Sequence, residues 1–525
     1  MSSSTSTTPG SLGSKLLRKG RDSVLGMDPQ KIIKNFFGAN SGITIVVLVL
    51  IMVFLLREGA GFLGTYHQEL EVYRKAGLEF CDIADTPLKE QQLLTSALRR
   101  AKTTTDAALK TALTDAEDAF DTAIEPAAEI LLELKTHATE TKELATEHHT
   151  LEAGRQQLLE AAAGTSDAKH KADLLKEAEL SKVDAPDYAE RIATMLERRG
   201  ELSQALTDYT TALETAAATL PEAVSDVKKA VPAHVATIRK ATENLQKWSW
   251  EEPVSYFTAV RSFLFGSAWI TNSSWHDIYG VVPLLVGSLL ISLVALLLAT
   301  PISISAAIYT NQFATDREKE IIKPVIEFIQ AIPSVVLGFI GIAVVGDLIK
   351  GISQWELLSW VPGFPIQERL NIFNAGFLLA FMAVPTMFSL AEDALNNVPR
   401  AYAEASDALG ATKLQTVFRV IVPAALSGIL SAILLGLGRV VGETMVVLLV
   451  AGNRIAIPDF GDGVGVIFQP AHTLTGIIAQ ELGEVSRGSS HWQALFMVGI
   501  LLFLISLAVN GCARAIAKRF EHSKA

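Results

Sequence analysis

Residues 401–450 read AYAEASDALGATKLQTVFRVIVPAALSGILSAILLGLGRVVGETMVVLLV, and this stretch decides the fold. Its first part is polar and amphipathic and is broken by Gly410 and Pro423. The part that follows is apolar and long enough to cross a bilayer as a helix, which takes about 20 residues. Two charges, Arg439 and Glu443, lie within this apolar helix, four residues apart and therefore on one helical face.

A full charge is costly at the depth where Arg439 is expected. Counted at about 1.5 Å per residue from the start of the apolar helix, it lies near the middle of a hydrocarbon core of about 30 Å. A charge there costs at least about 3 kcal/mol unless it is paired or hydrated. Arg439 and Glu443 therefore mark a translocation pathway, a coupling element or a structural ion pair.

The composition separates an acidic region from a membrane region. The chain has 525 residues, 49% of them apolar, and a mean hydropathy of +0.32, which is high for a soluble protein. Its net charge is −11. Residues 57–280 sum to about −13, so the rest of the chain is near +2. The two cysteines, Cys81 and Cys512, are expected on opposite sides of the membrane, which excludes a disulfide between them.

Six apolar stretches predict an all-α protein with six transmembrane helices. Residues 1–35 are expected to be a disordered, basic cytoplasmic N-terminus. The first span, residues 36–56, is long enough to favour a retained anchor over a cleaved signal peptide. Basic residues on both flanks place the N-terminus and the tail at 514–525 in the cytoplasm. The other five spans are expected at 281–308, 325–345, 375–390, 425–450 and 495–513.

Between the first two spans lies a long insert, residues 57–278, rich in Ala, Leu, Glu, Lys and Thr. Its leucines follow a helical period, and Leu144, Leu151 and Leu158 recur every seven residues. The insert is therefore expected to be an extracytoplasmic bundle of long antiparallel helices, part coiled coil, with about five helices of roughly 15–35 residues. The expected breaks between helices are Pro126, Gly164, Pro186 and Pro221.

Histidines and glutamates in the insert do not predict a metal site. The residues concerned are His137, Glu140, Glu147, His148 and His149. No clean ligand spacing appears among them, so a solvated helix face is the better interpretation. The chain also has no G-x-x-x-x-G-K-[ST] phosphate-binding loop and no zincin, nucleophile-elbow or dinucleotide motif. We therefore expect no cofactor, no enzymatic activity and no ATP hydrolysis by this chain itself.

The polar part of residues 401–423 predicts a helix–turn–helix. A helix is expected over 402–409, followed by a turn at Gly410 and a second helix that closes at Pro423, where the next span opens. Such an element would project from the cytoplasmic face as a rigid knob. Leu409, Leu414 and Phe418 would be available on it for packing.

The spacing of this segment resembles the EAA loop of ABC importer permeases, E-A-A-x3-G-x9-I-x-L-P. The matching positions are Glu404, Ala405, Gly410 and Pro423, and the mild departures are Ser406, Val420 and Val422. In that family the loop docks into a groove of a separate ATPase subunit and carries its closing motion into the membrane. The resemblance implies this docking role for Glu404, Ala405, Ser406, Gly410 and Pro423.

Three further stretches are similar to the phosphate permeases of the Pst system, and to the C-type subunit in particular. They are GLGRVVGETMVV at 436–447, IPSVVLGFIG at 332–341 and AVPTMFSLAEDALNNVP at 383–399. The resemblance covers the first span and a five-helix permease core at 279–513, and it leaves the insert outside. It implies a type I ABC importer permease in the inner (plasma) membrane. The implied partners are a second homologous permease, a cytoplasmic ATPase dimer and an extracytoplasmic phosphate-binding protein, with no nucleic acid.

A pathway role for Arg439 and Glu443 fits passage of phosphate. Arginine offers a planar fork of donors that matches phosphate oxygens. A carboxylate would accept a hydrogen bond from hydrogen phosphate, which keeps a proton at pH 7 where sulfate has none. The competing interpretation is an internal salt bridge that never meets substrate. Thr444 is a weaker candidate for a hydroxyl contact, and Gly438 and Gly442 form a small-xxx-small pair suited to close helix packing.

Other polar groups near the spans have ordinary interpretations. Glu392 and Asp393 follow the fourth span as a solvated turn, and Asn453 and Arg454 serve as an interfacial anchor after the fifth. Two alternative functions remain beside phosphate import. One is import of another oxyanion or an organic solute. The other is a phosphate sensor or signalling protein with the insert as a ligand-binding stalk, which would predict two spans and a long cytoplasmic output domain.

Overall fold

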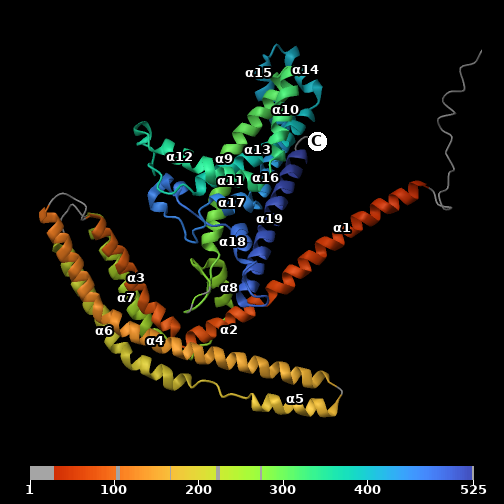
Figure 1. The fold of residues 1–525 in the computed structure, drawn as a ribbon. Helices are drawn as coiled ribbons and strands as arrows, with labels where there is room; N and C mark the ends of the chain where they lie inside the picture. Colours follow the sequence, from red (N-terminus) through yellow and green to blue (C-terminus); the bar gives the residue numbers. More distant parts are fainter. Residues whose placement is uncertain are drawn as a thin grey trace, which may run out of the picture.

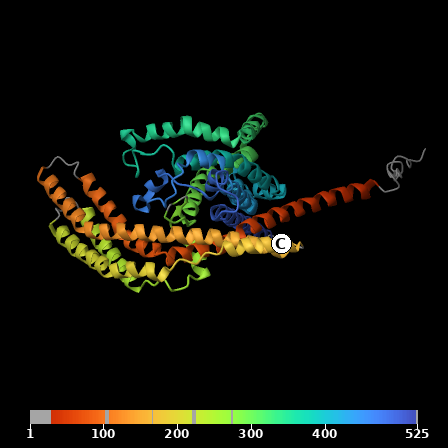
Figure 2. The same ribbon diagram turned by 60° about the horizontal axis from the view of Figure 1, so that its bottom comes forward.

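The computed structural model describes residues 29–101, 107–165, 167–219, 225–271, 273 and 275–522. Most of the predicted N-terminal region and the predicted break at Pro221 lie outside these residues. The described chain forms a membrane body and a helical insert. Helices α14 and α15 lie at one end of the membrane body, and the insert lies at the other end (Figures 1 and 2). The α-helices are α1 Pro29–Ala60, α2 Phe62–Lys75, α3 Leu78–Ala101, α4 Ala107–Gly164, α5 Ala168–Leu180, α6 Tyr188–Thr219, α7 Ser225–Lys247, α8 Tyr256–Phe265, α9 Val282–Ile308, α10 Asp316–Ala331, α11 Ser334–Ile340, α12 Gly346–Ser353, α13 Ile372–Asn396, α14 Arg400–Ala408, α15 Lys413–Thr416, α16 Val422–Val441, α17 Met445–Val450, α18 Leu474–Glu481 and α19 Ser490–His522.

Shorter elements join these helices. The π-helices are η2 Tyr309–Phe313, η3 Gly341–Val345 and η5 Val417–Ile421, and the 3-10 helices are η4 Glu356–Leu358 and η6 Phe460–Phe468. Strands β1 Trp269–Ile270 and β2 Ile278–Tyr279 pair antiparallel, with Trp269 opposite Tyr279. This small sheet stands between the insert and α9, where the chain enters the membrane body.

The number of predicted spans is confirmed within the described residues. Six helices are long and apolar enough to cross a membrane, as candidate spans at Lys34–Lys75, Val282–Phe313, Ser334–Ser353, Ile372–Asn396, Lys413–Val441 and Ser490–Ala515. A signalling protein with the insert as a stalk would have two spans, and the structure shows six candidate spans instead. Most side chains of α1 between 36 and 56 are exposed, and Figure 1 shows this helix projecting from the rest of the chain. An apolar helix of this kind is suited to lipid or to a partner helix.

The predicted start of the third span was wrong. We expected it at residue 325, but residues 316–331 form the separate amphipathic helix α10, and the membrane helix begins at Ser334. Thr315 and Glu318 form a capping box at the start of α10, which fixes where this helix begins. Pro333 then separates α10 from α11, because a proline disfavours helical geometry in the residue before it.

The insert contains a four-helix bundle of α3, α4, α6 and α7 around one apolar core. Buried side chains from all four helices meet there, including Leu98, Leu131, Leu206 and Ile238. The predicted break at Pro126 was wrong, because α4 runs unbroken through it. Pro126 is exposed, and the adjacent Ile124 and Ala127 are buried in the bundle core. Their packing stabilises the helix by more than the loss of the Pro126 backbone donor costs. The helix end at Gly164 is confirmed.

The leucine heptads do not form a buried seam. Leu144 and Leu151 are both 39% exposed in the distal half of α4, where α5 packs alongside (Figure 1). The buried positions of α4 in this region are instead Ala138, Thr141, Ala145 and Ala162. The distal half of α4 and α5 therefore make a two-helix arm that continues the bundle.

An aromatic cluster fastens the insert to the membrane body. Phe62 of α2 stacks on Tyr66 at 5.2 Å and lies edge-on to Phe263 of α8 and Tyr279 of β2, at 5.1 and 5.6 Å between ring centroids. Trp269 of β1 packs on Tyr279 at 5.4 Å. Aromatic pairs in these geometries add about 0.5–1.5 kcal/mol each beyond their buried area. The insert and the permease are thus joined by a packed apolar core.

Candidate translocation and coupling site

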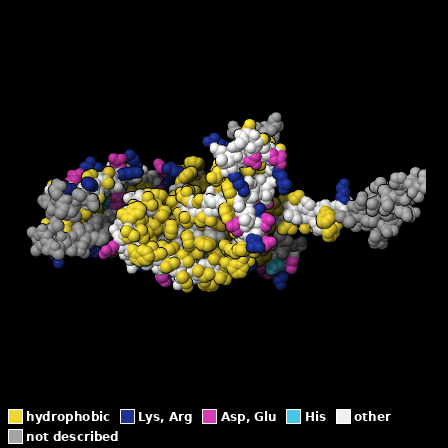
Figure 3. Space-filling view, turned by 90° about the horizontal axis from the view of Figure 1, so that it is seen from above, with side chains coloured by type: hydrophobic (Ala, Val, Ile, Leu, Met, Phe, Trp, Pro, Cys, Tyr) yellow, Lys and Arg dark blue, Asp and Glu magenta, His cyan; other side chains and the backbone are white. Residues whose placement is uncertain are grey.

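Helices α14 and α15 form the projecting end of the membrane body, next to α10 (Figure 1). Charged side chains gather over this end, and hydrophobic side chains gather over the adjoining body (Figure 3). The turn between α14 and α15 is made by Gly410, whose φ of +78° lies in the left-handed region that glycine adopts without strain. Thr412 then caps α15 and, with Gln415, completes a capping box.

One side-chain and one backbone hydrogen bond hold the two helices of this knob together. The Oγ atom of Ser406 lies 2.8 Å from Oγ1 of Thr416, and the carbonyl of Ser406 accepts from the Ala411 N–H at 3.2 Å. Ser406 replaces the second alanine of the family pattern, so this departure adds a contact to the knob. Lys413 lies over the ring of Phe313 at 5.3 Å, which links the knob to η2, the π-helix that follows α9.

The apolar residues expected on the outside of the knob are indeed exposed. Leu409 is 88% exposed, and Leu414 and Phe418 are each 60% exposed. Glu404 and Ala405 are exposed on α14 as well. Three large apolar side chains on one small projection form a surface suited to a protein partner.

The second helix of the knob does not close at Pro423 as we expected. Residues 413–441 form one helical run of α15, η5 and α16. Proline lacks an N–H and its ring clashes with the carbonyl four residues back. In η5 the hydrogen bonds shift by one residue, and the Val422 N–H reaches the Val417 carbonyl, five residues back. This shift accommodates Pro423 without ending the helix.

The knob is therefore joined to Arg439 by one helical rod. From Lys413 to Arg439 the rod measures about 40 Å at 1.5 Å per residue. Gly436 brings it against α13, because a Cβ at this position would lie 2.5 Å from Met387 Cγ. Gly438 and Gly442 have no such close neighbour among the described residues of other helices. A Cβ at Gly438 would lie 3.8 Å from Asn510 Oδ1 of α19, an ordinary contact distance, and the close packing expected of this pair stays a prediction.

The fifth span was wrongly expected to be one continuous helix. Helix α16 ends at Val441, and α17 begins at Met445, so Gly442, Glu443 and Thr444 lie in a break. Local side chains supply part of the hydrogen bonding that the break removes. Oε1 of Glu443 accepts from the Met445 N–H at 3.2 Å. A broken helix at membrane depth is tolerated where it is buried in protein or lines a cavity, and such breaks often mark binding sites.

The side chain of Arg439 does not pair with Glu443. Among the ion pairs of the described residues none joins the two, so the structure does not show the internal salt bridge considered above. Arg439 is exposed in this chain, and its Nη1 atom donates to Oγ1 of Thr386 on α13 at 3.2 Å. Among the described residues, no other hydrogen bond or ion pair of its guanidinium is seen. Thr444 makes a long contact of 3.5 Å to the Gly442 carbonyl.

Two hydroxyl residues of this site were missed from the sequence. Thr386 lies in the stretch quoted for its family resemblance, yet nothing in the stretch singles it out. Thr475 is more distant, on α18, and its Oγ1 donates to the Glu443 carbonyl at 2.8 Å. A threonine in an apolar helix commonly bonds to its own backbone, so only the fold reveals these two contacts.

Helix α18 connects the break to the insert. Its first turn is held on α9, where the Leu474 N–H donates to Ser288 Oγ at 3.0 Å. At its other end, Glu481 accepts from the Trp269 indole N–H of β1 at 3.3 Å and lies 2.7 Å from His491 Nε2 of α19. The helix therefore links the small sheet at the base of the insert to the backbone of Glu443.

Two other polar residues near the spans, Glu392 and Asn453, make contacts that the sequence did not predict. Glu392 was expected in a solvated turn, but it is 9% exposed and lies 2.7 Å from Lys323 Nζ of α10. This ion pair ties α10 to the end of α13 beside the knob. Asp393 is exposed as expected. Asn453 has a φ of +49° and donates to the Leu448 carbonyl at 2.8 Å, so it ends α17.

Comparison with known proteins agrees with this architecture. A family described as "Binding-protein-dependent transport system inner membrane component" matches residues 299–522. The phosphate transport system permease protein PstC of Pasteurella multocida is 31% identical over 49% of this chain and 81% of its own length. The probable ABC transporter permease protein YqgH of Bacillus subtilis is 33% identical over 50% of this chain and 82% of its own.

Two further matches are a mycobacterial sequence relative and a solved structure. The protein named PstC 1 of Mycobacterium tuberculosis is 31% identical over 51% of this chain and 82% of its own length. An inward-facing structure of the MetNI methionine ABC transporter aligns with 45% of this chain and 94% of its own, at 22% identity and a TM-score of 0.32. The assignment rests on the sequence relatives. Their coverage and identity show that this chain belongs to the family of binding-protein-dependent ABC importer permeases, in the group that contains the PstC proteins.

Proposed function

We propose that this chain is the C-type permease subunit of an ATP-driven importer of inorganic phosphate and provides half of its translocation pathway. The single observation that carries the proposal is the unbroken helical run from the exposed knob at 401–423 to Arg439. It joins a surface suited to a cytoplasmic partner with a guanidinium at membrane depth whose single described hydrogen bond goes to Thr386. The names of the PstC relatives support phosphate as the substrate.

The partners follow from the surfaces that the chain leaves uncovered. The exposed Leu409, Leu414 and Phe418 would seat in an ATPase subunit of a cytoplasmic dimer, which performs the ATP hydrolysis. A second, homologous permease would complete the pathway, and the glycines Gly438 and Gly442 are free to approach one of its helices. An extracytoplasmic phosphate-binding protein would deliver the substrate from the side of the insert.

The proposed topology places the knob and the C-terminal end of α19 in the cytoplasm, and the insert outside. Figure 1 draws the C-terminal end close to α14 and α15, with the insert at the opposite end. Arg317, Lys319 and Lys323 belong to α10 beside the knob, in agreement with the positive-inside rule. The chain would thus be a multi-pass inner-membrane protein with both termini cytoplasmic.

Substrate recognition would use the groups around the helix break. The free donors of Arg439 would bind two phosphate oxygens side by side. Glu443 has a second carboxylate oxygen that could accept a hydrogen bond from the O–H of hydrogen phosphate, and Thr444 could add a hydroxyl contact. Closure of the ATPases, transmitted along α15, η5 and α16, would move Arg439 relative to the rest of the site. This movement would expose phosphate to alternate sides of the membrane.

Uptake by reconstituted vesicles tests the proposal. The vesicles would hold this chain with its partner permease and ATPase subunits, and receive the binding protein outside and ATP inside. We expect accumulation of radiolabelled phosphate that arsenate inhibits and an equal concentration of sulfate does not. Inhibition by sulfate as strong as that by arsenate would instead support an importer of other oxyanions.

A further inference from the structure

Helix α8 lies where the insert meets the membrane body (Figure 1). Its C-terminal end is fixed to the start of α9 by two backbone hydrogen bonds. The Val281 N–H donates to the Phe263 carbonyl at 2.9 Å, and the Val282 N–H donates to the Gly266 carbonyl at 3.2 Å. Val282 is also the first residue of a candidate span. Helix α8 therefore stands at the level where this span leaves the bilayer.

Close packing holds α8 at this level. A Cβ at Gly266 would lie 2.8 Å from the Cα atom of Gly280, so the two strands of chain touch where only glycines fit. Phe263 is buried in one apolar cluster with Leu284, in the first turn of α9, and Leu495, in the second turn of α19. At about 1.5 Å per residue, both leucines lie within about 8 Å of the starts of their helices. The buried face of α8 thus packs on the ends of two membrane helices.

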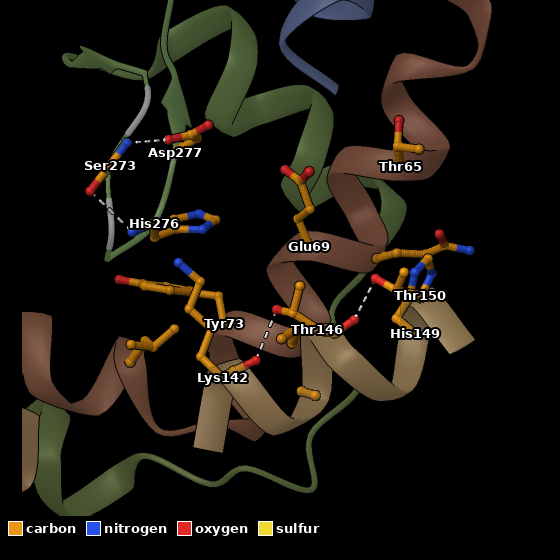
Figure 4. Close-up of a pocket in the computed structure, with 14 residues that line it drawn as sticks. Thr65, Glu69, Tyr73, Lys142, Thr146, His149, Thr150, Ser273, His276 and Asp277 are labelled. Atoms are coloured by element: carbon orange, nitrogen blue, oxygen red, sulfur yellow. Dashed lines mark hydrogen bonds between the residues drawn. The ribbon is translucent and has the colours of Figure 1, made fainter. Parts of the chain in front are cut away.

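The joint around α8 is polar on one side and apolar on the other. Thr65 and Glu69 of α2, Lys142 of α4 and Asp277 before β2 surround a pocket of about 300 Å³ on the side of α4 (Figure 4). On the side of α8, α2 presents Phe62, whose ring lies 5.1 Å from that of Phe263. The polar groups of the joint are therefore gathered toward the insert, away from α8.

The face of α8 that points away from this core is apolar and has one cation at its centre. Phe257, Arg261 and Phe265 are spaced four residues apart and therefore share one side of the helix. Phe257 is 72% exposed and Phe265 is 73% exposed, and Arg261 is exposed between them. Among the described residues, no hydrogen bond or ion pair of the Arg261 guanidinium is seen.

This set of side chains suits the headgroup region of a bilayer. Each phenylalanine side chain that stays in water forgoes about 1.5–3 kcal/mol of burial free energy. An arginine between two such side chains keeps its alkyl chain on apolar surface and extends its guanidinium to the lipid phosphates. Leu289 and Leu293 are exposed on the adjoining span α9 and are suited to lipid, so the bilayer reaches the helix to which α8 is fixed.

We propose that α8 is an interfacial helix that binds the phospholipid surface of the leaflet on the side of the insert. Phe257 and Phe265 lie at the boundary between headgroups and acyl chains, and Arg261 donates to lipid phosphate oxygens. Because α8 is fixed to α9, this contact holds the base of the insert on the membrane. The proposed topology enters only in the identity of the leaflet, which is the extracytoplasmic one.

Spin labelling of the full-length chain in phospholipid nanodiscs tests this placement. Cys512→Ser removes the exposed thiol, and Cys81 is buried. A cysteine introduced as Phe257→Cys or Phe265→Cys then carries the label. The measured quantities are its collision rates with oxygen, which concentrates in lipid, and with a charged Ni(II) chelate, which stays in water.

Leu180→Cys is the matched control for these labels. Leu180 is 79% exposed at the end of α5, and Figure 1 draws α5 on the far side of the insert from α14 and α15. We expect the labels at 257 and 265 to collide more often with oxygen than with the chelate. The label at 180 should show the reverse order.

Two substitutions of Arg261 test the contact with lipid phosphate. Arg261→Glu should shift the labels at 257 and 265 toward the chelate, because lipid phosphates repel a carboxylate. Arg261→Lys keeps the charge and a long alkyl chain, so it should leave both labels as they are in the parent. Labels unmoved by Arg261→Glu would overturn the role given to this arginine.

Two other results would overturn the inference as a whole. Labels at 257 and 265 that are as open to the chelate as the label at 180 would place this face of α8 in water. Exclusion of both reagents would show that a second copy of the chain covers the face. The measurement requires neither transport nor a partner subunit. A failure of phosphate uptake would therefore leave this inference intact, and a water-exposed α8 would leave the proposed import intact.

Discussion

Replacing Arg439 by Gln separates a pathway role from a structural one. In this chain the guanidinium makes a single described hydrogen bond, to Thr386 Oγ1 at 3.2 Å, and its side chain is exposed. Loss of one such bond should cost the fold about 1 kcal/mol or less. The variant should therefore insert, bind its partner subunits and survive purification in the same yield as the parent.

The effect on uptake should be much larger than the effect on the fold. A bidentate arginine contact supplies two charge-assisted hydrogen bonds to phosphate, each worth about 1.5–3 kcal/mol. Their loss corresponds to a decrease of roughly 100-fold or more in phosphate affinity at the site. The phosphate affinity of Arg439→Lys should lie between those of the parent and Arg439→Gln, because lysine keeps the charge but lacks the planar fork of donors.

The assay is radiolabelled phosphate uptake by reconstituted vesicles, with co-purification of the ATPase subunits as a check of assembly. Arg454→Gln is the matched control, since Arg454 is an exposed arginine just beyond the fifth span. It should retain uptake within about twofold of the parent, as surface charges contribute little. Normal uptake by an assembled Arg439→Gln complex would show that Arg439 is not part of the translocation pathway.

Three further changes probe the knob, the break and the insert. Gly410→Val should strain the turn by about 1–2 kcal/mol because of its positive φ, and should uncouple ATP hydrolysis from uptake; normal co-purification and transport would show that the knob assignment is wrong. Thr475→Val should lower uptake several-fold with little change in melting temperature, because the Glu443 carbonyl loses its donor; unchanged uptake would show that α18 does not position the break. Deletion of residues 86–242 should leave uptake intact, since the aromatic joint around Phe62 is kept; complete loss of uptake would make the bundle part of the transport machinery.

The sequence predicted the membrane helices because their signal is local. An apolar run of about 20 residues is visible without knowing the fold, and so are Arg439 and Glu443 inside one. Boundaries set by capping were harder to place. The start of α10 depends on the Thr315 and Glu318 capping box, and the passage of the helix through Pro423 depends on the shifted hydrogen bonds of η5.

The features that the sequence did not predict depend on distant partners. The break after Val441 is held by Thr475, more than 30 residues further along the chain, so no local pattern announces it. Pro126 lies inside α4 because the bundle core packs on both sides of it, which outweighs a local preference. The ion pair of Glu392 with Lys323 likewise joins two helices that the sequence places in separate segments.

We propose that a rigid rod carries the motion of a cytoplasmic ATPase from the knob to Arg439. The most direct measurement is ATP-dependent phosphate accumulation by vesicles that contain the parent chain, compared with vesicles in which Val420–Val422 of the rod is replaced by three glycines. We expect both complexes to hydrolyse ATP and only the parent to accumulate phosphate. Equal accumulation by the glycine-interrupted rod would contradict this proposal.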